Sequence, residues 1–189
     1  MTKVIGTLHW SGSSYTPDDL DRDCYHCGVV YDSTKKKAQG EKWNNYTDWQ
    51  PQHTYKQNTG NIAVSAICML NATITDFGDY PIIKAIIDEM VLCAAEISIL
   101  KGMTEKDWKT HAERAVEYAG PEGPYGPLSG DKSTKWDLAL FVPLWNSWGS
   151  QAAANKDVRA HGDTMRARIK AHLVAGVKPR AFHLVDVDK

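Results

Sequence analysis

The segment from Pro81 to Leu100 constrains the fold of this 189-residue chain more than any other. Its apolar side chains recur at intervals of three and four residues, the spacing that lines one face of an α-helix. They are Ile82, Ile83, Ile86, Ile87, Met90, Val91, Ala94 and Ile97. Pro81 suits a first helical turn and Gly102 suits the position after the last one. The pattern therefore predicts a long helix with an apolar face.

Short apolar runs before this helix are typical of strands. The first, Val4–His9, is followed by the turn-rich residues 11–14. A second covers Tyr25–Tyr31, and the most apolar run, Asn61–Leu70, is expected to be a central strand. Because these strands alternate with helical segments, the sequence predicts an α/β fold with a central mixed sheet flanked by helices.

Weaker patterns predict the remaining segments. In chain order they are a short helix that Thr16 caps and Pro17 opens, a loop or hairpin over 32–52, a capping box at Thr104–Asp107, a loop over 120–130, an apolar segment over 136–145 and a helix over 150–174. We expect one main domain over residues 1–148 and a helical extension over 149–189, packed on that domain or tethered to it.

The composition is that of a globular domain. Hydrophobic residues make up 42% of the chain and charged residues 24%. The net charge of −1 favours neither nucleic acid nor a membrane as a partner. The apolar start is too short for a signal peptide, and no run of 18 apolar residues occurs. We therefore expect a protein that is made and folded in a cytosol, with no stable membrane insertion.

Four cysteines are too few for a disulfide scaffold. Cys24 and Cys27 have CxxC spacing, for which two reduced strand cysteines are a simpler interpretation than a redox or structural zinc site. Cys68 and Cys93 lie in apolar runs and are expected in the core.

Residues able to build a metal site lie far apart along the chain. His9 ends the first predicted strand, where a side chain points into the cleft above a sheet. Lys135 and Asp137 share one face of an extended segment. Taken singly, each of these residues has an ordinary explanation. His9 and His111 could be core or surface histidines, and Lys135 and Asp137 could form an exposed ion pair. Together, two histidines and a carboxylate make a catalytic zinc site with one position open for water.

Six motifs in a fixed order point to one family. They are His9 with small polar residues after it, Tyr25-His26 before a strand, His53 followed by Asn61-Ile62-Ala63-Val64, the long helix after Pro81, Thr110-His111-Ala112-Glu113, and Lys135-Trp136-Asp137-Leu138. Over residues 4–145 the chain thus resembles the zinc amidases that include the bacteriophage T7 lysozyme and the peptidoglycan recognition proteins.

The resemblance implies a zinc-dependent N-acetylmuramoyl-L-alanine amidase. Such a hydrolase cuts the amide between muramic acid and L-alanine in peptidoglycan. Residues 1–148 would form the catalytic domain, and His9, His111 and Asp137 would bind Zn²⁺. Zinc polarises a carbonyl and lowers the pKa of bound water to about 7.

The resemblance also implies roles for residues around the metal. Lys135 would donate to the oxyanion of the tetrahedral intermediate. Tyr25 would position or deprotonate the attacking water. His53 and His26 would line the substrate cleft. Ser65 stands where some family members carry a glutamate general base, so catalysis would depend on Tyr25 and zinc.

The expected setting is a phage or prophage endolysin, a bacteriolytic monomer held in the host cytoplasm until its release to the cell wall. A cytosolic amidase that recycles wall fragments is an alternative. A non-catalytic peptidoglycan-binding module of the same fold and an unrelated metal-dependent hydrolase are two others.

The tail has a basic character that the resemblance does not cover. The stretch from Lys156 to Arg180 contains seven lysines and arginines but only two aspartates. This stretch could touch the anionic wall or lipid headgroups. A solvated helix face with an apolar stripe packed on the domain is the simpler interpretation.

Overall fold

A mixed β-sheet forms the centre of the molecule. The computed structural model describes residues 3–47, 51, 53–54, 57–70, 78–119, 158–180 and 185–186. The strands are β1 (Ile5–Trp10), β2 (Cys27–Asp32), β3 (Lys37–Lys42), β4 (Asn61–Ala66), β5 (Trp108–Thr110) and the two-residue β6 (Val185–Asp186). Their order in the sheet is β5-β1-β4-β2-β3-β6. Strand β1 pairs in parallel with β4 and β5, whereas β2 and β3 form an antiparallel hairpin. The predicted α/β class and mixed sheet are confirmed.

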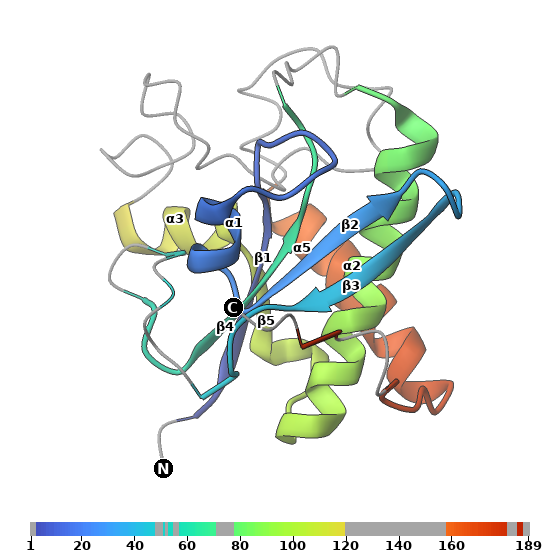
Figure 1. Cartoon of the computed structure of the whole chain (residues 1–189). Coiled ribbons are helices and arrows are strands. Elements are labelled where there is room, and N and C mark those ends of the chain that lie inside the picture. Colours follow the sequence, from blue (N-terminus) through green and yellow to red (C-terminus); the bar gives the residue numbers. More distant parts are fainter. Residues whose placement is uncertain are drawn as a thin grey trace.

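Helices cover both faces of the sheet. They are α1 (Asp19–Cys24), α2 (Tyr80–Lys101), α3 (His111–Ala119) and α5 (Val158–Val174), with a short 3₁₀ helix, η1 (Glu105–Asp107), before β5. In Figure 1, α2 and α5 lie on one side of the sheet, and α1 and α3 lie on the other. Among the described residues, no helix is both long enough and apolar enough to cross a membrane.

Helix α2 supplies more residues to the core than any other described element, nine of the 23 in the main cluster, as its apolar periodicity predicts. The Asp79 side chain accepts from the backbone N–H of Ile82 at its start, and Gly102 ends it with a positive φ of 64°. Such a left-handed residue at a helix end favours glycine. The buried face contacts strand residues including Leu8 and Val64. Each large aliphatic side chain buried there stabilises the fold by about 1.5–3 kcal/mol.

The alternation of side chains along β1 and β4 separates this core from a polar face. Leu8 lies opposite Val64 and His9 lies opposite Ser65. Because successive side chains point to opposite faces of a strand, His9 and Ser65 point away from α2. Thr7 shares their face, and its hydroxyl accepts a hydrogen bond from Arg114 of α3. The polar face therefore lies under α3.

Three predicted boundaries were wrong, for local reasons. The first helix is capped by Asp18, not Thr16, because the side chains of Asp18 and Asp21 bond each other's backbone N–H groups. Since Tyr25 is the C-cap of that helix, the strand expected from residue 25 begins at residue 27. The central strand ends at Ala66 instead of Leu70.

The first strand is shifted by one residue, from the predicted Val4–His9 to Ile5–Trp10, and three further predicted elements are confirmed where the structure describes them. The loop or hairpin over 32–52 contains β3, and the capping box at Thr104–Asp107 is present around η1. In α5, Met165 and Ile169 are buried and Leu173 packs against the core. The predicted segments 120–130 and 136–145, and residues 150–157 of the last predicted helix, lie outside the described residues.

All four cysteines are free thiols. Cys27, Cys68 and Cys93 are buried, and Cys24 is half-buried. Cys24 ends α1 and does not lie in a strand, which corrects the view of both CxxC cysteines as strand residues. Burial raises the pKa of the Cys68 thiol well above its usual range.

Candidate functional site

Four aromatic side chains from separate parts of the chain meet on the polar face of the sheet. The His9 ring lies at their centre. Its centroid is 4.5 Å from that of His111, 5.2 Å from that of Tyr25 and 5.2 Å from that of His53. His9 and His53 are buried, whereas Tyr25 and His111 are half-buried. The structure thus brings together four of the residues that the sequence singled out.

Parallel pairing explains why His9 and His111 are neighbours despite their distance along the chain. Strands β1 and β5 run side by side, with Leu8 opposite Thr110. His9 directly follows Leu8, and His111 directly follows Thr110 as the first residue of α3. Because the carboxyl ends of parallel strands meet at the same edge of a sheet, both imidazoles come to one place.

The hydrogen bonds of His53 assign the protons of two rings. Its Nε2 lies 3.1 Å from the carbonyl oxygen of Asn61, which can only accept, so His53 Nε2 carries a hydrogen. In the neutral ring, Nδ1 then accepts. Two groups face this Nδ1 as donors, His9 Nε2 at 3.2 Å and the Thr54 hydroxyl at 2.8 Å. A His9 ring that donates from Nε2 to this junction carries its lone pair, when neutral, on Nδ1.

The environment of His53 keeps its ring neutral. Burial, followed by the neighbouring His9 and His26, lowers the pKa of His53 well below its ordinary value of 6.5. The hydroxyl of Thr54 lies 2.8 Å from His53 Nδ1 and 3.5 Å from His9 Nε2, so it also contacts the junction between the two rings. His53 acts here as an acceptor that orients His9.

His26 lies deeper in the same cluster. It is fully buried, its Nδ1 accepts from the backbone N–H of Ala63 at 3.1 Å, and its ring centroid is 5.8 Å from that of His53. These contacts give both histidines a role in supporting the sheet face. That His53 and His26 also contact substrate stays a prediction.

Ser65 adds a second polar group beside His9. The two residues are opposite each other in the register of β1 and β4. The Ser65 side chain is fully buried, and its hydroxyl has no hydrogen-bond partner among the residues that the structure describes. A buried hydroxyl of this kind calls for an explanation, such as an ordered water or a ligand.

Two of the three predicted zinc ligands, His9 and His111, come together. Asp137 and Lys135 are outside the described residues. Among the residues that are described, no group of three or more His, Cys, Asp or Glu side chains is arranged to hold a metal ion. The donor chemistry of the pair nevertheless fits zinc, because a ligating histidine usually donates its other ring N–H to a fixed acceptor, as His9 does to His53.

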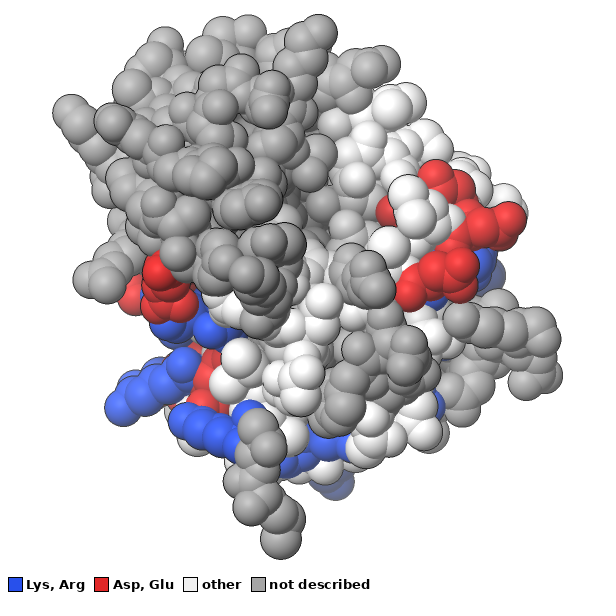
Figure 2. Space-filling view, turned by 90° about the vertical axis from the view of Figure 1, so that its left-hand side faces the viewer, with Lys and Arg blue, Asp and Glu red and all other residues white. Residues whose placement is uncertain are grey.

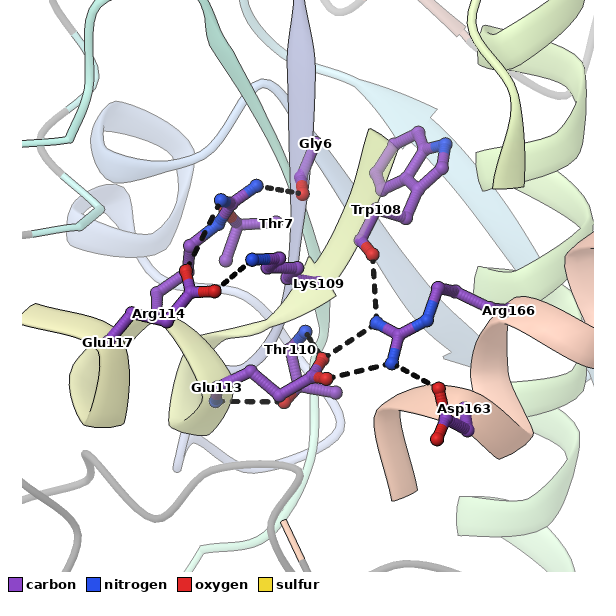
Figure 3. Close-up of polar contacts among 10 residues, drawn as sticks. All are labelled: Gly6, Thr7, Trp108, Lys109, Thr110, Glu113, Arg114, Glu117, Asp163 and Arg166. Carbon is purple, nitrogen blue, oxygen red and sulfur yellow. Dashed lines mark hydrogen bonds and ion pairs between the residues drawn. The ribbon is translucent and has the colours of Figure 1, made fainter. Parts of the chain in front are cut away.

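Figure 3 shows a polar network at the corner between β5 and α3, which was not foreseen from the sequence. Thr110 and Glu113 form reciprocal hydrogen bonds at the start of α3, and Arg166 of α5 forms an ion pair with Glu113. The T-x-x-E spacing of Thr110 and Glu113 could have revealed the capping box. No local signal marks the contacts of Arg166 with Trp108 and Glu113, because both partners are more than 50 residues away.

Other basic residues of the tail also pair internally. Arg168 bonds Asp88 of α2, and Arg180 bonds the fully buried Glu96. On the face turned to the viewer in Figure 2, basic side chains lie near the lower edge with acidic side chains among them, and a further acidic group lies at the upper right. Three arginines of the tail thus stabilise the packing of the segment, in keeping with the simpler interpretation of its sequence.

The chain was compared with known proteins in three ways. No family model, no curated protein and no solved structure matches it.

Proposed function

We propose that this chain is a zinc-dependent N-acetylmuramoyl-L-alanine amidase with the fold of the phage lysozyme and recognition-protein family. The observation that carries the proposal is the meeting of His9 and His111 at one edge of the sheet, 4.5 Å apart between ring centroids. The motif order in the sequence and the α/β sheet support it. The substrate would be the muropeptide amide of peptidoglycan.

His9, His111 and Asp137 would hold Zn²⁺. Bound there, the metal would supply a Lewis acid for the scissile carbonyl and make water acidic enough to attack near neutral pH. The His9 lone pair on Nδ1, set by the hydrogen bond to His53, is a suitable donor. The proposal thus gives the neutral, buried His53 a purpose, which is to hold His9 in one tautomer and one orientation.

The remaining steps fall to Tyr25 and Lys135. Tyr25 lies beside His9, with the ring centroids 5.2 Å apart and the ring planes tilted by 45°. Its hydroxyl group would position the attacking water or take its proton. Lys135 would donate to the oxyanion as it forms. The proton taken from water would pass to the leaving nitrogen of L-alanine.

The setting that we propose is a phage or prophage endolysin. The protein would act as a monomer and reach the wall from the host cytoplasm. The internal pairing of Arg166, Arg168 and Arg180 leaves fewer tail charges for attraction to the anionic wall.

Product analysis tests the proposal directly. The protein is incubated with purified peptidoglycan, and new N-terminal alanine and new reducing sugar are measured. The amidase reaction releases alanine termini without reducing ends, whereas a binding module of the same fold sediments with the wall and releases neither. Reducing ends without alanine would refute the proposed bond specificity.

Variants assign the roles. His111→Ala should lose both bound zinc and activity, while His172→Ala, a matched change on α5 away from the site, should lose neither. Lys135→Ala should lower turnover with little loss of zinc. Equal activity in Lys135→Ala and the wild type would contradict the oxyanion role.

A further inference from the structure

The corner between β5 and α3 determines where His111 points. Thr110 is the last residue of β5 and His111 is the first of α3. The backbone N–H of Thr110 donates to Glu113 Oε2 at 2.9 Å, and the N–H of Glu113 donates to Thr110 Oγ1 at 3.2 Å. His111 lies between the two halves of this capping box. Its backbone direction therefore depends on the Glu113 carboxylate.

One guanidinium bonds both sides of that corner. Arg166 reaches from α5 and donates to the two carboxylate oxygens of Glu113, at 2.8 and 3.0 Å. It also donates to the backbone carbonyl of Trp108 in β5, at 3.1 Å. Figure 3 shows Arg166 between the strand and the first turn of α3, with Asp163 on its outer side. A bidentate arginine pair is more directional than a lysine contact.

The contact is closely fitted. The Glu113 side chain is only 6% exposed, so its charge requires the arginine. Gly162 of α5 packs directly on the carboxylate, since a Cβ atom at this position would lie 2.1 Å from it. Without Arg166, a buried carboxylate would lose its counter-ion. The three-residue edge strand β5 would lose a bond to its carbonyl.

We propose that Arg166 and Glu113 are positioning residues that hold His111 against His9, and that α5 is for this reason an integral part of the candidate site. The inference rests on the proposed function only for the identity of the metal and the reaction. Arg166 touches neither imidazole in this scheme. It acts through the capping carboxylate and the strand carbonyl.

The test compares Arg166→Ala with the full-length wild type. The dissociation constant for Zn²⁺ is measured by competition with a chromophoric chelator, and the contact between the His9 and His111 rings is followed by NMR in metal-free protein. We expect zinc binding to weaken by about 10–100-fold, the usual effect of losing a residue that orients a metal ligand. The ring contact should weaken too. Arg166→Lys should recover only part of both losses.

Controls separate positioning from simple loss of stability. Arg180→Ala breaks a comparable pair with the buried Glu96 of α2, so it should lower the melting temperature while zinc affinity stays within about twofold of the wild type. If Arg166→Ala does not fold, Glu113→Gln replaces it, because the amide still accepts from Thr110 but loses the charge that pairs with Arg166. Zinc affinity and ring contact equal to those of the wild type, in whichever of the two variants folds, would overturn the inference.

The inference and the proposed function can fail separately. A wild-type protein that binds zinc but releases no alanine termini would refute the amidase, while the zinc measurement on the variants still decides the role of Arg166. If the wild type binds no zinc, the contact between the His9 and His111 rings in metal-free protein decides the role of Arg166. In folded Arg166→Ala, kcat should fall more than KM rises, because His111 is displaced and the substrate cleft is not.

Discussion

Replacing His53 by phenylalanine tests the hydrogen-bond chain beneath the site. Phenylalanine fills nearly the same ring volume but carries no nitrogen. The change removes the donor to the Asn61 carbonyl, at 3.1 Å, and the acceptor for His9 Nε2, at 3.2 Å. A buried polar group left without its partner costs about 1–3 kcal/mol. Two such groups predict a loss of about 2–6 kcal/mol in the free energy of unfolding.

The same variant should also change how stability depends on pH. The pKa of His53 is lowered in the folded protein below its ordinary value of 6.5, chiefly by burial. Between that value and the folded pKa, the unfolded chain binds one more proton than the native state. Stability therefore falls as the pH falls through this window, by up to about 1.4 kcal/mol per pH unit from this ring. The phenylalanine variant lacks this contribution, so its deficit relative to the wild type should shrink on acidification.

Urea denaturation at several pH values between 7.5 and 5 measures both effects. His172→Phe on α5 is the control, and we expect it to change stability by less than about 0.5 kcal/mol. Two results would refute the reasoning. One is a His53→Phe variant as stable as the wild type at neutral pH, and the other is a stability deficit that does not vary with pH.

Three further predictions concern packing and reactivity. Gly28→Ala should destabilise the protein by about 1–3 kcal/mol in a denaturant titration, because the new methyl group would lie 1.9 Å from the Trp43 ring; an unchanged midpoint would contradict this. Arg180→Ala should lower the free energy of unfolding by about 3 kcal/mol, because it leaves the fully buried Glu96 without its main counter-ion. A double variant that also carries Glu96→Gln should recover part of this loss. Iodoacetamide should label Cys24 first in the native protein, as the other three thiols are buried; mass spectrometry that finds another cysteine modified first would disprove this.

The elements found from the sequence are those whose signal is local. The period of the apolar residues in α2 and the apolar run that begins at Asn61 depend only on neighbouring residues. Both elements formed, although the strand ends at Ala66 and not at Leu70. Strand β5 was missed. It has only three residues, and it exists because Trp108–Thr110 pair with Gly6–Leu8, about 100 positions away. No short-range pattern encodes such a pairing.

The candidate site divides in the same way. His9 and His111 could be selected from a motif order, and Glu113 could have been found from its spacing to Thr110. The contacts that orient these three side chains could not be predicted from the sequence. The acceptor role of His53 depends on where the Asn61 carbonyl falls, and Arg166 finds Glu113 only after α5 packs on the sheet edge. Both contacts arise from tertiary packing, which leaves no periodic pattern in the sequence.

The neighbouring position of β1 and β5 also sets the order in which the protein can be assembled. Pairing Gly6 with Trp108 closes a loop of about 100 residues, and this closure carries an entropic cost before any contact compensates it. Arg166 follows later still in the order of synthesis. A chain emerging from the ribosome can thus complete the hairpin of β2 and β3 early, whereas His9 and His111 can meet only after β5 and the start of α3 have been made. A chain shorter than this would carry separate imidazoles and no assembled pair, so the candidate centre cannot appear before β5 pairs with β1.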